Sequence, residues 1–168
     1  MLYAPPNCQV RWIRQNNRDA FPSMTQLSNA VHGRIKALCL NGDIFAQEAE
    51  YTAALEQYWM AWDLLPEPQT DCEAATWILG AIGDANFLGR DFDAGRDNLS
   101  MAMHCPGAIG NPFLHLRLGQ CQFELGNLDR AADNLARAYM AAGRDIFEGE
   151  EKYFMFLKSR LKPPPDGW

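Results

Sequence analysis

Residues 119–139 read GQCQFELGNLDRAADNLARAY, and a related stretch occurs 36 residues earlier (119 − 83), where residues 83–103 read GDANFLGRDFDAGRDNLSMAM. The two stretches align without a gap, and the run Asp-Asn-Leu occurs at 97–99 and again at 133–135. A third, weaker copy begins 41 residues before the second (83 − 42), at Gly42. Self-similarity at this spacing is typical of stacked helical repeats, so the repeat is the first feature to interpret.

Within the third copy, the apolar residues predict two helices joined by a tight turn. They recur at spacings of three and four, which is the helical period. Gly126-Asn127 interrupts this run, as expected of a turn between antiparallel helices. The apolar positions are Leu118, Cys121, Leu125, Leu128, Ala131, Leu135 and Ala138.

The repeated pattern resembles the tetratricopeptide repeat, a unit of two antiparallel helices. In that family small residues let the two helices approach closely, and large residues fill the space between neighbouring pairs. This sequence departs from the pattern at Asn41, Gly95 and His115, where Leu, Ala and Trp are usual, and its repeat junctions are long. The matching structural positions are Gly42, Tyr51, Ala54 and Ala61, then Gly83, Phe92 and Ala102, then Gly119, Ala131 and Ala138.

The resemblance implies an all-α fold, a right-handed superhelix (an α-solenoid) of about three helix pairs. We expect one domain over residues 23–162, with repeats at about 35–68, 74–107 and 112–145 and a C-terminal capping helix within 146–162. A long helix is expected from about 24 to 48, capped by Ser23, followed by a helix from about 50 to 64. Residues 1–22 are predicted to be irregular, and residues 163–168 form a Pro-rich tail.

Composition indicates a soluble globular protein. The chain has 168 residues, a net charge of −6 and 48% hydrophobic residues, which suits one domain with a continuous core. The apolar runs are far shorter than a membrane span, and residues 1–20 contain Arg11, Arg14 and Arg18 and do not look like a secretory signal. We therefore expect a cytoplasmic protein that does not enter a membrane.

Cysteines and histidines predict no metal centre, cofactor site or catalytic grouping. The five cysteines are odd in number and contain no CxxC pair, which argues against a disulfide framework and a zinc site. We expect Cys121 in the core. His104-Cys105, before Pro106-Gly107, suits turn chemistry better than the alternative of a metal or nucleophile fragment, and His115 suits packing better than proton transfer. No known catalytic motif occurs, so a non-enzymatic protein is expected.

The resemblance also implies a binding groove, because the first helix of each pair lines the concave side of such solenoids. Four aromatic residues at these positions exceed what an idle surface needs, since aromatics dominate interface energetics. The alternative is that the N-terminal segment or the C-terminal helix of the same chain covers them. Lys36 is the only groove cation, so clamping of a terminal carboxylate is not expected. The candidate groove residues are Lys36, Asp43, Trp77, Asp84, Phe87, Phe113, Gln120 and Phe123.

The charge distribution indicates a partner with a basic and apolar surface. Residues 43–97 hold twelve acidic and two basic residues (2 − 12 = −10), whereas residues 1–36 hold five basic and one acidic residue (5 − 1 = +4). An acidic surface attracts basic partners and repels nucleic acid. The sequence thus predicts a binding protein for one partner protein or peptide, of the bacterial immunity (toxin-neutralising) or chaperone type. A general adaptor or assembly scaffold is the alternative; an enzyme or metal-binding protein would lack a recognisable site.

Overall fold

The computed structural model describes residues 28–162, and the regular elements in this range are all helical. The predicted irregular segment 1–22, the predicted cap Ser23 and the tail 163–168 lie outside the described residues. The α-helices are α2 (Asn29–Gln47), α3 (Tyr51–Trp62), α4 (Glu73–Leu88), α5 (Phe92–Ala102), α6 (Pro112–Glu124), α7 (Leu128–Ala142) and α8 (Glu151–Arg160). Two short 3-10 helices, η1 (Gln69–Asp71) and η2 (Arg144–Phe147), lie in connections.

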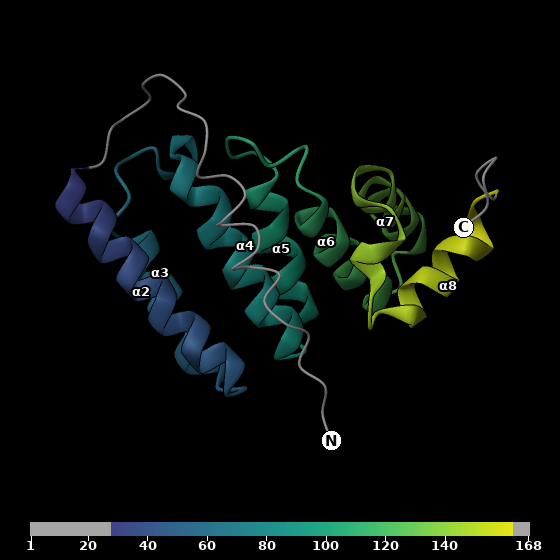
Figure 1. Ribbon diagram of the computed structural model, residues 1–168, viewed down its shortest axis with the longest axis horizontal. Coiled ribbons are helices and arrows are strands. Elements are labelled where there is room, and N and C mark those ends of the chain that lie inside the picture. Colours follow the sequence, from purple (N-terminus) through teal and green to yellow (C-terminus); the bar gives the residue numbers. More distant parts are fainter. Residues whose placement is uncertain (1–27, 163–168) are drawn as a thin grey trace.

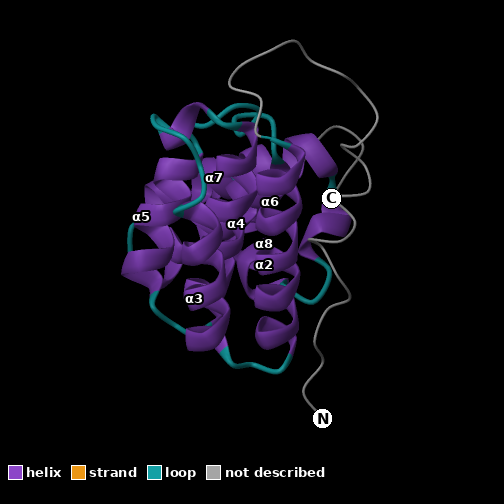
Figure 2. Cartoon of the chain, turned by 90° about the vertical axis from the view of Figure 1, so that its left-hand side faces the viewer, coloured by secondary structure: helices purple, strands orange, loops and turns teal. Residues whose placement is uncertain are grey.

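The helices are arranged as three antiparallel pairs followed by a single helix. Helix α2 packs on α3, α4 on α5 and α6 on α7, and the second helix of each pair packs on the first helix of the next. Figure 1 shows the pairs side by side, with α2 and α3 at one end of the row and α8 at the other. Figure 2 shows two layers, one containing α3 and α5 and the other α2, α6 and α8. The expected all-α repeat solenoid is confirmed.

Each pair is held together at a glycine of its first helix. The small residue leaves room for one large side chain of the second helix, so the two backbones come close enough for that side chain to fill the space between them. A Cβ atom at Gly42 would lie 2.4 Å from Tyr58, one at Gly83 would lie 2.4 Å from Leu99, and one at Gly119 would lie 2.8 Å from Leu135. These residues stand at matching positions of the three repeats, so the close contact repeats with the sequence.

The turn inside each pair is the same hydrogen-bonded structure three times. One residue with positive φ follows the first helix: Ala49 (φ 61°), Arg90 (φ 66°) or Gly126 (φ 76°). Its N–H donates to the carbonyl three residues back, over 3.0–3.1 Å, and the next N–H donates to the carbonyl five residues back, over 2.8–2.9 Å. This is the Schellman arrangement that commonly ends helices, usually with Gly at the left-handed position. The turn expected at Gly126-Asn127 is present.

Helix starts follow capping chemistry. The Asn111 Oδ1 accepts from the N–H of Phe113 at 2.9 Å with Pro112 at the first helical position, and the Asp91 carboxylate accepts from Ala94 at 3.1 Å. Helix α2 begins at Asn29, because Ser28 has non-helical backbone and its Oγ accepts from the N–H of Val31. The described part of the expected helix 24–48 thus runs from Asn29 to Gln47, and residues 24–27 lie outside the described residues.

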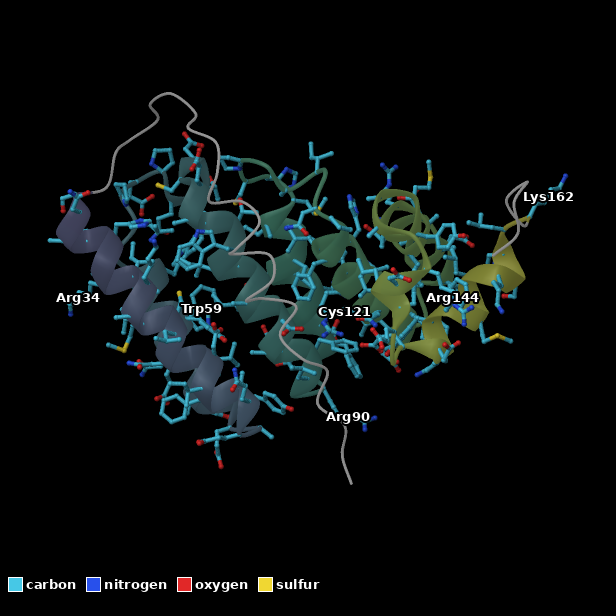
Figure 3. All side chains as sticks on the ribbon, viewed as in Figure 1. Arg34, Trp59, Arg90, Cys121, Arg144 and Lys162 are labelled. Atoms are coloured by element: carbon cyan, nitrogen blue, oxygen red, sulfur yellow. The ribbon has the colours of Figure 1, made fainter. Side chains whose placement is uncertain are left out.

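The interior contains two apolar clusters that meet near α6. The larger cluster runs from α2 to α6, and the smaller joins α6, α7, η2 and α8. Cys121 is fully buried in the larger cluster, as expected, and Figure 3 labels it within the row of helices. Cys39, Cys72 and Cys105 are also buried free thiols, and Cys8 lies outside the described residues.

His104 and Cys105 lie in the turn that follows α5. The thiol of Cys105 donates to the carbonyl oxygen of Met101 over 3.7 Å, and so satisfies a carbonyl at the end of that helix. His104 is exposed to solvent, whereas Cys105 is buried. The arrangement fits the turn chemistry expected of this dipeptide.

We predict that Gly83→Ala destabilises the fold by about 1–3 kcal/mol, because the new methyl group would overlap Leu99 and force the pair apart. The matched control is Gly33→Ala on α2, where no atom lies within 4 Å of the new Cβ. That change should stabilise by about 0.5–1 kcal/mol through helix propensity. Chemical unfolding of both variants measures the difference; equal effects would contradict the proposed close packing.

A second prediction concerns the left-handed turn residues. Ala49→Gly should raise the free energy of unfolding by about 0.5–1 kcal/mol, because Gly adopts positive φ without the steric penalty that Ala carries. Gly126→Ala, at the matching turn, should lower it by a similar amount. Thermal and urea unfolding test the pair of variants, and the same sign for both would show that backbone strain does not decide this position.

Candidate functional site

The candidate residues lie on the first helices of the three pairs, which form one layer of the molecule (Figure 2). We call this surface the first-helix face and define it by the eight predicted residues and by Arg117, which the structure adds. Helix α2 carries Lys36 and Asp43, α4 carries Trp77, Asp84 and Phe87, and α6 carries Phe113, Arg117, Gln120 and Phe123.

Asp43 is held at this face by a tyrosine from the second helix of its own pair. Tyr58 replaces the leucines of the other repeats, and its ring packs against Gly42. Its hydroxyl thereby reaches α2 and donates to the Asp43 carboxylate over 2.8 Å. Burial raises the pKa of Asp43 and outweighs the hydrogen bond from Tyr58, which lowers it; the nearby charge of Asp84 raises it further. Keeping Asp43 ionised in the folded protein therefore costs free energy.

The structure also contains a buried arginine that the repeat pattern did not predict. Arg117 pairs with Asp84 of α4 through Nε, and its Nη1 donates to Glu150, just before α8, over 3.1 Å. Nη1 also donates to the Gln120 side chain over 2.7 Å. The Arg117 side chain is 8% exposed, so this group ties three successive parts of the solenoid together by charge-assisted hydrogen bonds.

Two aromatic rings of the first-helix face flank the Arg117 guanidinium. Its central carbon lies 4.5 Å from the centroid of Phe87 and 5.6 Å from that of Phe113. Burial opposes the charge of Arg117, but Asp84 and Glu150 outweigh it and raise the pKa, so the residue stays cationic. Sequence analysis missed Arg117 because it falls between the expected groove positions; the signal was a single cation within the apolar run 113–119, FLHLRLG.

Helix α8 covers the C-terminal part of this face. The Tyr153 ring lies 5.4 Å from the ring of Phe123 and 6.3 Å from that of Phe87, and the Phe156 ring lies 4.9 Å from Phe123. The Glu124 carboxylate accepts from Lys152 and from the Tyr153 hydroxyl, each over 2.6 Å. Burial opposes ionisation of Glu124, but these two hydrogen bonds outweigh it and lower the pKa. The anticipated alternative, in which the C-terminal helix occupies part of the groove, is present here.

The predicted residues thus differ in what they present to solvent. Lys36 is exposed, and Asp43, Trp77 and Phe113 are partly exposed, so among residues 28–162 these four form the open part of the face. Phe87 and Phe123 are partly exposed but packed against α8, and Asp84 is engaged by Arg117. Gln120 is fully buried and supports the Arg117 cluster instead of facing a partner.

His115 is buried, and both of its ring nitrogens lie within hydrogen-bond distance of protein oxygen atoms. Its ring is 6% exposed, with Nε2 2.8 Å from the carbonyl oxygen of Ile109 and Nδ1 3.1 Å from the Asn134 side-chain oxygen. The residue therefore links α6 to the preceding loop and to α7, as a packing residue would. Across residues 28–162 the structure brings together no group of three His, Cys, Asp or Glu side chains that could hold a metal ion. None of the described helices is long and apolar enough to span a membrane.

Comparison with known proteins identifies the fold. No family model matches the chain, and no curated protein matches its sequence. The structure is similar to the first TPR domain of the human RPAP3 protein, with a TM-score of 0.60 and 16% identity over 76% of this chain and 94% of that one. It is equally similar to the Yersinia enterocolitica type III secretion chaperone SycD in complex with a peptide of the translocator YopD, with a TM-score of 0.60 and 16% identity over 80% and 95%. The predicted tetratricopeptide-type fold is confirmed.

We predict that Asp43→Asn raises the free energy of unfolding at neutral pH. Because the pKa of Asp43 is raised, the native state binds more protons than the unfolded state above pH 3.8, and stability falls as the pH rises through this range. The Asn variant has no ionisable group at this position and does not lose stability in this way. The difference in free energy of unfolding between the variant and the wild type should therefore vanish near pH 3.8. Urea unfolding at several pH values measures it.

Tyr58→Phe is the companion variant for this test. It removes the hydroxyl that donates to Asp43 and should lower stability by about 1 kcal/mol or more at neutral pH, and by less when the carboxyl is protonated. A Tyr58→Phe effect that does not change with pH would contradict the proposed hydrogen bond to an ionised Asp43.

Proposed function

We propose that this protein is a non-enzymatic interaction module that binds a segment of one partner protein on its first-helix face. The observation that carries the proposal is the open part of that face, where Trp77 of α4 and Phe113 of α6 stand at matching positions of successive repeats and Asp43 is partly exposed on α2. Partly exposed aromatic rings on a rigid helical layer are the kind of anchor site that dominates protein interfaces. Cytoplasmic location belongs to the same proposal.

The partner segment, on this proposal, is apolar with at least one basic residue. An apolar side chain would pack on Trp77 and Phe113. A Lys or Arg would meet Asp43, whose ionised form is disfavoured by burial and would gain from a cation. Asp84 already pairs with Arg117. It would therefore contribute to partner binding indirectly, by holding the guanidinium against Phe87 and Phe113. Nucleic acid is left out of the proposal because residues 43–97 hold twelve acidic and only two basic residues.

We favour a dedicated partner of the chaperone or immunity type over a general scaffold. SycD, which shares the fold, is a chaperone whose structure contains a translocator peptide. By analogy, a small solenoid with one open face suits a single client or toxin. A scaffold would bind two partners at the same time on two surfaces, whereas a chaperone or immunity protein would bind one. The number of partners per protein therefore distinguishes the two functions.

The proposal predicts that Trp77→Ala weakens partner binding by about 2 kcal/mol or more, the loss typical of an interface anchor. Peptides are selected on the wild-type protein from a displayed random library, and their affinities are then measured by titration calorimetry. The matched control is Trp59→Ala. Trp59 is 38% exposed and lies on α3, in the other layer of helices (Figure 2). This change should leave affinity unchanged.

Each variant is first checked for an unchanged thermal unfolding curve. Peptides that bind Trp77→Ala as tightly as the wild type, or that lose affinity only with Trp59→Ala, would show that the first-helix face is not the binding site. For the partner from the native cell, light scattering of the purified complex separates the two functions. One partner per protein supports the chaperone or immunity type, and two simultaneous partners support a scaffold.

A further inference from the structure

Helix α2 carries apolar residues on two opposite faces, although among the described helices it lies at the end of the row and has neighbours on one side (Figure 1). Ile35, Cys39 and Gly42 face the protein and are buried. Leu40 and Ile44 are 61% and 48% exposed, respectively. A helix that is apolar on two faces is normally covered on both, and the end of a solenoid normally has a polar outer surface.

The exposed residues form a regular seam along α2. Gly33, Ala37, Leu40 and Ile44 follow one another at spacings of four, three and four, which places them on one stripe of the helix. All four are exposed, and no atom lies within 4 Å of a Cβ built at Gly33. We call these four residues the α2 seam. Its N-terminal half is small and its C-terminal half is large.

From this arrangement we propose that two copies of the chain associate through the α2 seam, with the two α2 helices antiparallel. With the two helices centred on residue 41, Ile44 of each copy lies beside Ala37 of the other, and Leu40 of each copy lies between Leu40 and Ile44 of the other. The contact is isologous and closes on itself as a dimer.

The charges beside the seam favour the same orientation. Arg34 borders the small half and Glu48 the large half; both are exposed, and they occupy equivalent flanking positions two heptads apart. Figure 3 shows Arg34 on the outer side of α2, at the end of the row opposite Lys162. In an antiparallel pair Arg34 of each copy meets Glu48 of the other, about a midpoint at residue 41 ((34 + 48)/2 = 41), where Asn41 meets its own copy.

Within one chain Arg34 and Glu48 cannot interact, because fourteen residues of helix separate them by about 21 Å. Any energetic coupling between these two side chains therefore reports contact between copies. The seam belongs to the outer end of the solenoid, whereas Trp77 and Phe113 belong to α4 and α6. The inference accordingly stands or falls independently of the proposed function.

The test is sedimentation equilibrium of the full chain from about 1 to about 100 μM, a range that covers dissociation constants of ordinary homodimers. We expect a dimer for the wild type and a dissociation constant at least about tenfold higher for Leu40→Glu. Ile44→Glu is the second seam variant, in case Leu40→Glu alters the fold. Met140→Glu, at a methionine of α7 that is 85% exposed, is the matched control and should leave the dimer intact.

Orientation is tested by charge exchange. Arg34→Glu and Glu48→Arg should each weaken the dimer, and the double variant Arg34→Glu/Glu48→Arg should restore wild-type affinity, because it re-forms both ion pairs with reversed sign. A wild-type monomer throughout the concentration range overturns the proposal, as does a dimer unaffected by the seam variants. Additive weakening in the double variant overturns the antiparallel orientation.

Discussion

The contact on which the structure depends is the one between a glycine of each first helix and a large residue of the following helix. Gly42, Gly83 and Gly119 leave no room for a Cβ beside Tyr58, Leu99 and Leu135, so each pair has one possible depth of packing. Once that depth is set, the second helix of one pair presents a fixed surface to the next pair. Because the contact recurs in every repeat, the orientation of successive pairs follows from it, and the first helices come to share one layer.

That layer contributes to stability and is the proposed binding surface, and Arg117 shows how the two roles would be divided. The guanidinium is nearly removed from solvent, so it requires the carboxylates of Asp84 and Glu150 and the amide of Gln120. Loss of one partner would leave a buried charge without compensation. The stability lost in this way would be much larger than the net stabilisation that the intact cluster provides. The C-terminal half of the first-helix face thus joins α6 to α4 and α8, whereas Asp43 and Trp77 stay partly exposed in the described part of the chain.

The two ends of the solenoid differ in the side chains that lie over their apolar residues. At the C-terminal end, α8 places Tyr153, Phe154 and Leu157 against the protein and Lys152 and Lys158 over aromatic rings, so part of the apolar surface is covered by cationic side chains while Met155 stays exposed. At the other end, among the described residues, α2 leaves Leu40 and Ile44 exposed. A repeat architecture by itself leaves apolar surface at its ends, because every internal pair has a surface that packs against another pair.

The sequence alone determined the fold class, because the repeated Gly, Phe and Leu positions and the turn at Gly126 depend on local helical geometry and on contacts that recur at one spacing. It also placed Cys121 in the core and His115 in a packing role. Which groove residues stay open was decided by tertiary structure: α8 lies over Phe87 and Phe123, Gln120 is enclosed, and Asp84 is taken by Arg117. The contacts of Tyr153 with Phe123 and Phe87 join residues 30 and 66 positions apart (153 − 123 = 30; 153 − 87 = 66), through a capping helix that breaks the repeat, and the Arg117–Asp84 pair joins residues 33 positions apart (117 − 84 = 33) on α6 and α4. A repeat pattern describes what successive units have in common, so it carries no information about contacts that occur once.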